Sequence, residues 1–257
     1  MRNRKKGYEL PRSVIRDACD VFSLPSFQCT MSSDEDGLED DESAAVESSS
    51  QAIGVFGQKR SGKDSLSDLF CSQFPDCDRR NWADGLKECI CTLFGVTRAF
   101  IEEWKENPEP PPGWLLPMRQ VLQKFGDGMR QFKPGVWLDY SFRNPQPKMI
   151  FVDGRYINEM SKVKSVPQSV NVLLYRPGFL NDSDHPSEAQ VRPIVQFLLE
   201  CGAEGEVEPV LAELQGTAIP EGTQYIDLFI RNDGTIEDLR GKLNNIILPY
   251  IQKVFGG

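Results

Sequence analysis

The strongest chemical pattern in this 257-residue sequence is a loop between two apolar patterns. Residues Gly57–Asp64 read G-Q-K-R-S-G-K-D, after a short apolar run at Ala52–Phe56 and before apolar residues at helical spacing. Glycines at this spacing let backbone N–H groups turn inward around a phosphate chain, and a helix N-terminus adds further N–H groups. We therefore expect a phosphate loop, with Lys63 reaching the β- and γ-phosphates of a nucleotide. Its expected contacts are Gly57, Lys59, Arg60, Ser61, Gly62, Lys63, Asp64 and Ser65.

Asp64 occupies the position where Ser or Thr usually supplies a hydroxyl to Mg²⁺, and Ser65 follows it. A carboxylate repels polyphosphate unless a divalent cation lies between them, so Asp64 is a candidate metal ligand, directly or through water. An acidic residue in a first helical turn also stabilises the helix. Both interpretations of Asp64 remain open at this point.

Charge is distributed unevenly along the chain. The net charge is −9, and residues 31–51 contain eight acidic side chains with no Lys or Arg, so the remainder sums to −1. A nearly neutral body offers no broad basic surface, and we expect no nucleic-acid partner. A phosphate site must instead be built locally from a few cations.

The composition divides the chain into two regions. Residues 1–51, basic and then acidic, contain too little apolar surface to offset the entropy of ordering, and we expect a disordered extension before a folded domain at 52–257. No apolar stretch is long enough to span a membrane, and the start lacks a signal-peptide pattern, so we expect an intracellular protein. Seven cysteines and one histidine, His185, form no familiar zinc spacing.

Further apolar runs predict the fold class. Buried strands are expected at Met149–Asp153, Val170–Tyr175 and Tyr225–Ile230. Strands that alternate with helices indicate an α/β fold with a parallel sheet covered on both faces. The helical patterns lie around Trp82–Phe94, Arg98–Lys105, Pro117–Phe132 and Thr235–Phe255.

Several motifs behind the phosphate loop occur in a recognisable order. From Gly54 to about Leu243 the sequence resembles, discontinuously, the deoxynucleoside monophosphate (dNMP) kinases of bacteriophages and large DNA viruses. The loop's K-R-S-G-K-D is that family's form, and W-A-D-G-L-K at 82–87 resembles its F-A-D-P-L-K. The other motifs are R-x-x-L-Q-x-x-G at 119–126, V-D-x-R-Y-x-N-E at 152–159, R-P-G at 176–178, H-x-S-E at 185–188 and N-D-G at 232–234.

The resemblance implies a P-loop kinase fold, α/β/α in three layers, with nucleoside monophosphate (NMP)-binding and lid helical segments. It implies ATP and Mg²⁺ as cofactors and a dNMP as acceptor. The lid falls at about 178–222, where this chain has an insertion at 193–222, and Arg176 and Arg192 flank it. Implied catalytic residues are Lys63, Arg119, Arg155 and Arg176; implied substrate contacts are Asp84, Lys87, Arg119, Gln123, Asp153 and Arg155; Asn232 resembles an adenine-side turn.

Other interpretations compete with this one. The loop alone also fits another small-molecule P-loop kinase, such as a dephospho-coenzyme A kinase or a nucleoside kinase. A catalytically inactive P-loop module, kept as a binding or virion protein, is a third alternative. Asp84 is explained almost as well as a helix N-cap. A homodimer is left open.

Overall fold

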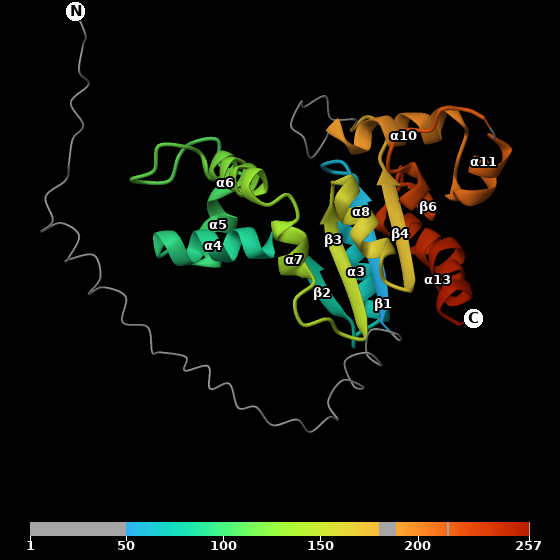
Figure 1. The fold of residues 1–257 in the computed structure, drawn as a ribbon, viewed down its shortest axis with the longest axis horizontal. Coiled ribbons are helices and arrows are strands. Elements are labelled where there is room, and N and C mark those ends of the chain that lie inside the picture. Colours follow the sequence, from blue (N-terminus) through green and yellow to red (C-terminus); the bar gives the residue numbers. More distant parts are fainter. Residues whose placement is uncertain (1–49, 180–188, 215, 257) are drawn as a thin grey trace, which may run out of the picture. The chain divides into compact units, whose positions relative to one another are not determined.

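A mostly parallel six-stranded sheet organises the computed structural model, which describes residues 50–179, 189–214 and 216–256. The strand order is β2-β3-β1-β4-β6-β5 (Figure 1). Five strands run parallel, and only the short β5 pairs antiparallel, with β6. The strands are β1 (Gln51–Gly57), β2 (Asp78–Asn81), β3 (Lys148–Gly154), β4 (Gln168–Tyr175), β5 (Gly205–Glu206) and β6 (Leu228–Arg231).

Successive side chains of β1 point to opposite faces of the sheet, so the strand contributes to a core on each face. Ala52 and Phe56 join one cluster with α8 and α10, whereas Ile53 and Val55 join the other with α3, α12 and α13. All four side chains are buried. The predicted α/β fold with a sheet covered on both faces is confirmed. The covering helices are α3 (Lys63–Gln73), α8 (Ile157–Lys164), α10 (Val191–Glu200), α12 (Ile236–Lys242) and α13 (Leu248–Phe255), with a π-helical turn, Leu243–Ile247, between the last two.

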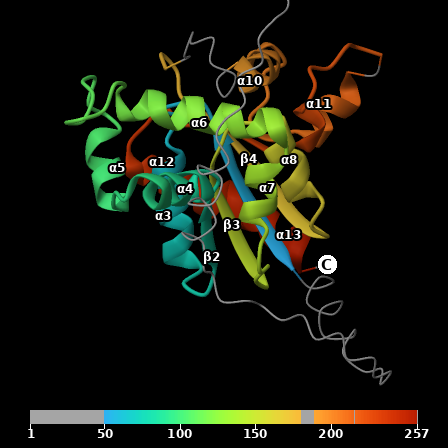
Figure 2. The ribbon, with the colours of Figure 1, turned by 60° about the vertical axis from the view of Figure 1, so that its left-hand side comes forward.

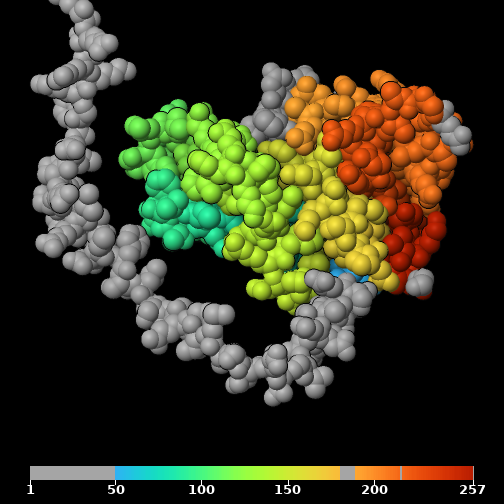
Figure 3. Space-filling model, viewed as in Figure 1, coloured from blue at the N-terminus to red at the C-terminus, as the bar shows by residue number. Residues whose placement is uncertain are grey.

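A separate helical lobe lies between β2 and β3 in the sequence. Ile90, Ile101 and Met118 form its own small core, one residue from each of three helices. Figure 1 shows these helices to one side of the sheet, Figure 2 shows α6 crossing the upper ends of the strands in the turned view, and Figure 3 shows the green lobe. The lobe contains four of the implied substrate contacts, Asp84, Lys87, Arg119 and Gln123. Its helices are α4 (Asp84–Phe94), α5 (Arg98–Trp104) and α6 (Met118–Phe132), and α7 (Val136–Ser141) leads back to the sheet.

The strand expected at Tyr225–Ile230 is partly wrong. Thr223–Tyr225 is a 3₁₀ turn, and β6 begins only at Leu228. The turn is fixed by tertiary hydrogen bonds, because Asn171 in β4 donates its side-chain amide to the Tyr225 carbonyl at 2.8 Å. Strand β1 already includes Gln51, and residues 1–49, which carry most of the expected extension, lie outside the described residues.

The segment expected to form the lid, at about 178–222, includes elements that pack against the sheet. Helix α10 buries Val191, Ile194, Val195 and Leu198 against the sheet, and β5 extends the sheet edge. Helix α11 (Glu208–Glu213) follows β5. The H-x-S-E motif at 185–188 lies outside the described residues. Across the described ranges, no helix has both the length and the apolar character needed to cross a bilayer.

Candidate active site

The loop between β1 and α3 has the backbone geometry of a phosphate cradle. Gly57 and Gly62 have φ angles of 147° and 102°, which favour glycine, and Arg60 also has a positive φ of 65°. A Cβ at Gly57 would lie 2.5 Å from the Leu174 carbonyl oxygen, so the loop leaves no room for a side chain there. Helix α3 begins at Lys63 and directs its first backbone N–H groups toward the loop.

Lys63 is held by the loop it belongs to. Its side chain is buried, its ammonium donates to the Gln58 carbonyl at 2.7 Å, and it lies 3.5 Å from the Asp153 carboxylate. The side-chain amide of Asn232, which follows β6, donates a hydrogen bond to the Ser61 carbonyl of the loop at 2.9 Å. Both contacts hold the loop in its cradle shape before any phosphate arrives.

Residues at the carboxyl ends of four further parallel strands lie near the loop. Trp82 follows β2, Asp153 lies near the end of β3, Arg176 follows β4 and Asn232 follows β6. Strand β1 is the point where successive strands begin to be added on the opposite side of the sheet: β3 lies on one side of β1 and β4 on the other. Ligands of open α/β sheets bind at such a switch point, beyond the carboxyl ends of the strands. The fold therefore concentrates the sequence-predicted residues at one edge.

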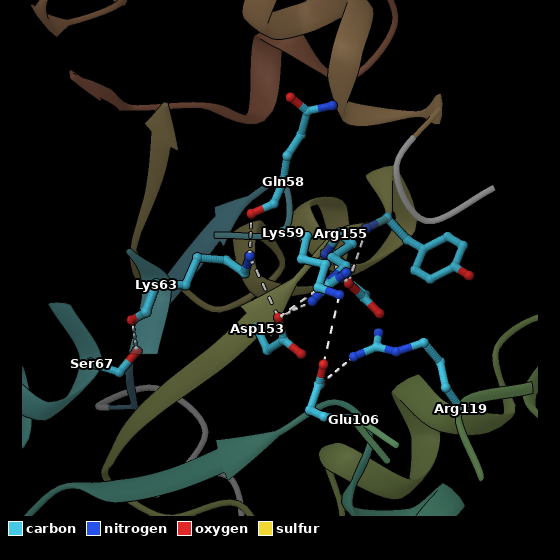
Figure 4. A network of polar contacts seen from close by, with 10 residues as sticks. Gln58, Lys59, Lys63, Ser67, Glu106, Arg119, Asp153 and Arg155 are labelled. Carbon is cyan, nitrogen blue, oxygen red and sulfur yellow. Dashed lines mark hydrogen bonds and ion pairs between the residues drawn. The ribbon is translucent and has the colours of Figure 1, made fainter. Parts of the chain in front are cut away.

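Asp153 links two cations at this edge. Its carboxylate accepts hydrogen bonds from Arg155 Nε at 3.1 Å and Nη2 at 2.9 Å, and it pairs with Lys63 (Figure 4). Burial alone would raise the pKa of Asp153, but the Arg155 and Lys63 charges outweigh it and hold that pKa below its ordinary value. Asp153 has a positive φ of 58°, a backbone conformation disfavoured for a residue with a side chain. The carboxylate thus stays ionised and fixes both cations.

Helix α6 forms the wall of an open cavity opposite the phosphate loop. Arg119, Gln123, Asp127 and Arg130 recur at spacings of four, four and three residues, which places them on one helix face. All four line the cavity. Arg130 pairs with Asp127 at 3.2 Å, and its guanidinium lies 4.2 Å from the centre of the Tyr156 ring.

These walls enclose an open cavity of about 720 Å³. Nine Lys or Arg side chains and five Asp or Glu side chains line it, a formal surplus of four positive charges in a chain whose net charge is −9. Such a cavity attracts polyanions. It includes twelve of the sequence-predicted residues: Lys59, Arg60, Gly62, Lys63, Asp64, Ser65, Lys87, Arg119, Gln123, Asp153, Arg155 and Arg176.

Four of the expected nucleotide and substrate contacts do not line this cavity. Gly57 and Ser61 form the inner turn of the loop, and the side chain of Asn232 braces that turn. Asp84, in the first turn of α4, accepts from the Asn81 backbone N–H at 3.0 Å and pairs with Arg98. These contacts position the loop and join two helices of the lobe.

Lys87 and Arg176 line the cavity, and each also contacts another side chain. Lys87 donates to Glu102 at 2.5 Å, which joins α4 to α5. The Arg176 guanidinium lies 5.2 Å from the centre of the Phe179 ring. Arg192, expected to flank the lid, is half-buried in α10 and does not line the cavity.

The cavity also contains residues that the sequence did not single out, among them Arg130, Glu159 and Glu106. Arg130 could have been found, because it continues the helix face of Arg119 and Gln123. Glu159, within the 152–159 motif, accepts from the backbone N–H groups of Arg155 and Tyr156 at 2.7 and 3.0 Å. Burial raises the pKa of Glu159 to about 7, although these N–H groups favour its ionised form. Glu106 pairs with Lys59 and Arg119 in the structure. No sequence pattern pointed to it, because it lies in a turn before a proline-rich loop.

The donor set at the cavity can be compared with what ATP and Mg²⁺ require. The described residues contain no cluster of three or more His, Cys, Asp or Glu side chains able to hold a metal. Mg²⁺ beside a nucleotide, however, usually takes one or two carboxylates together with phosphate oxygens and water. The exposed Asp64 in the first turn of α3 fits that requirement, and the loop fits a polyphosphate.

Comparison with known proteins supports the resemblance seen in the motifs. A protein of Acanthamoeba polyphaga mimivirus described as "Putative deoxynucleotide monophosphate kinase" is 27% identical over 165 residues, which cover 56% of this chain and 84% of that protein. No protein-family model matches the chain.

Solved structures similar to the chain include a dephospho-CoA kinase from Campylobacter jejuni (13% identity, TM-score 0.34, covering 80% of this chain and 98% of that one). Another is a thymidylate kinase from Candida albicans (15% identity, TM-score 0.35, covering 78% and 92%). The fold itself is defined by the sheet order and the loop geometry. The chain is an α/β protein with a P-loop, and its sequence is similar to that of a protein named as a dNMP kinase.

Proposed function

We propose that the chain is a deoxynucleoside monophosphate kinase, which transfers the γ-phosphate of ATP to a dNMP and yields dNDP and ADP for DNA precursor synthesis. The observation that carries the proposal is the positively charged cavity, with the phosphate loop on one wall and Arg119 on the other. Two polyanions can approach each other only where such charge offsets their repulsion. The name of the mimivirus relative favours a dNMP over other small-molecule acceptors.

The donor would lie along the loop. Backbone N–H groups of Gly57–Asp64 and the Lys63 ammonium would hold the β- and γ-phosphates. Lys63 would exchange its bond to the Gln58 carbonyl for a phosphate oxygen. When bound, Mg²⁺ would neutralise charge between the phosphates, with Asp64 as its protein ligand.

The acceptor phosphate would lie toward α6. Arg119 would orient it through its planar fork, and Arg155 would stabilise charge on the group in transfer. The second pKa of a phosphate monoester is about 6, so the attacking oxygen is largely ionised at neutral pH and needs no general base. That oxygen forms a bond to the γ-phosphorus while the bond from the γ-phosphorus to the β–γ bridging oxygen breaks, and ADP leaves.

Asp153 would act as a positioning residue for this chemistry. It touches Arg155 and Lys63, one cation for the group in transfer and one for the donor. Preorganised charges cost less to arrange at the moment of reaction than mobile ones. The ionised carboxylate therefore keeps the two cations at a fixed separation.

The test is a coupled assay of ADP release across dNMPs, ribonucleoside monophosphates, deoxynucleosides and dephospho-coenzyme A. We expect rapid ADP release with at least one dNMP and little with the last two acceptors. Turnover with dephospho-coenzyme A or a nucleoside alone would move the chain to another kinase class. ATP binding without turnover on any acceptor would instead favour an inactive P-loop module.

A further inference from the structure

Glu106 connects the two walls of the cavity. It lies in the turn after α5, two residues beyond Trp104, and belongs to the helical lobe. One carboxylate oxygen is 3.8 Å from the Lys59 ammonium of the phosphate loop, and the other pairs with the Arg119 guanidinium of α6. Figure 4 shows Glu106 directed at both cations. A single anion therefore bridges the predicted donor and acceptor sides.

This carboxylate holds a position suited to a phosphoryl group. An arginine fork binds carboxylate and phosphate oxygens with the same geometry, and a lysine ammonium donates to either kind of oxygen. The Glu106 side chain is 59% exposed, so a ligand can displace it without unfolding any element. Because the ion pairs are exposed, each contributes little, and a doubly charged phosphate can compete with a singly charged carboxylate.

We propose that the point between Lys59 and Arg119 is an anion subsite for phosphoryl oxygens at the junction of donor and acceptor, and that Glu106 is its internal occupant. This inference rests on the proposed function. Substrate phosphates must displace the carboxylate, which releases the turn after α5 from the phosphate loop. Glu106 thus competes with substrate and holds both cations in place while the cavity is free of nucleotide.

Glu106→Gln tests the competition, because it removes the charge and preserves the shape of the side chain. The probe is inorganic pyrophosphate, which carries phosphoryl oxygens and no base, titrated calorimetrically at low salt without Mg²⁺. Loss of two exposed ion pairs predicts binding about 2- to 30-fold tighter than in the wild type. Glu109→Gln is the matched control, since Glu109 lies in the same loop and does not line the cavity. It should leave the affinity close to that of the wild type.

A double variant makes the test specific to this pair of cations. In an Arg119→Ala background, Glu106→Gln should improve pyrophosphate binding much less, because half of the subsite has gone. Equal affinities of wild type and Glu106→Gln, the same gain in Glu109→Gln, or a full gain without Arg119 would each overturn the inference. So would a failure of both wild type and Glu106→Gln to bind pyrophosphate.

The outcome is separable from that of the proposed function. If Glu106→Gln binds pyrophosphate no more tightly while the wild type phosphorylates a dNMP, the subsite is wrong and the function stands. Tighter binding by the variant, with no dNMP phosphorylated by either protein, keeps the subsite and removes the proposed acceptor.

Discussion

Replacing Glu159 by Gln removes a buried carboxyl group that lines the cavity and braces the backbone of Arg155 and Tyr156. Only 4% of Glu159 is exposed, and burial raises its pKa from an ordinary 4.5 to about 7. Between these two values the folded protein holds a proton that the unfolded chain has lost. Protonation therefore stabilises the fold at low pH, and the free energy of unfolding falls as the pH rises toward 7.

The size of the effect follows from the two pKa values. A rise from 4.5 to about 7 is about 2.5 pH units, and each unit corresponds to about 1.36 kcal/mol. The wild type should thus lose up to about 3 kcal/mol of stability from this group between pH 4.5 and 7. Gln can accept the same two N–H groups and does not titrate, so the variant should lack this loss.

The assay is urea unfolding of wild type and Glu159→Gln at several pH values from 4 to 8. The informative quantity is the change with pH in the difference between their unfolding free energies, because any constant packing cost of the amide cancels. The variant should gain on the wild type as the pH rises from 4.5 to about 7. Glu237→Gln, an exposed site on α12, is the control. A difference that does not vary with pH, or that moves in the opposite direction, would refute the reasoning.

Three further predictions address the site and the extension. Lys63→Ala should fold normally and lose at least about 10²–10³-fold in phosphoryl transfer, measured by ADP release, because a cation on the donor phosphates is removed; near-normal turnover would exclude the loop as the donor site. Arg119→Ala should weaken dTMP binding about 10- to 150-fold and ATP binding far less in calorimetric titrations, with Arg119→Lys recovering only part; the reverse pattern would place Arg119 on the donor side. Deletion of residues 1–49 should leave activity within a few-fold, since the predicted phosphate contacts all follow Ala52; a folded but inactive product would place the extension in the site.

Much of the sheet could be predicted from the sequence because its central strands are continuous apolar runs. β1, β3 and β4 are buried on both faces, an environment that favours apolar runs such as Met149–Val152. β2 escaped prediction because it reads D-R-R-N and lies at the edge of the sheet. Its Arg80 is held by the carbonyls of Ser141, Arg143 and Asn144, contacts that involve residues about sixty positions away.

The site was predictable where a motif coincides with a strand end or a helix start. Lys63 and Asp153 belong to such places, and the structure brings them within 3.5 Å of each other. Glu106 could not be found, because its importance depends on how the lobe folds back toward the loop. For the same reason the sequence did not distinguish Asp84, which joins α4 to α5, from the side chains that face the cavity.

The most direct measurement of the central claim follows the label from γ-³²P-ATP in the presence of each dNMP. Wild-type protein should transfer the label to the acceptor and form labelled dNDP, and Lys63→Ala, equally folded, should not. Label found only in inorganic phosphate, or in another acceptor such as dephospho-coenzyme A or a nucleoside, would contradict the account.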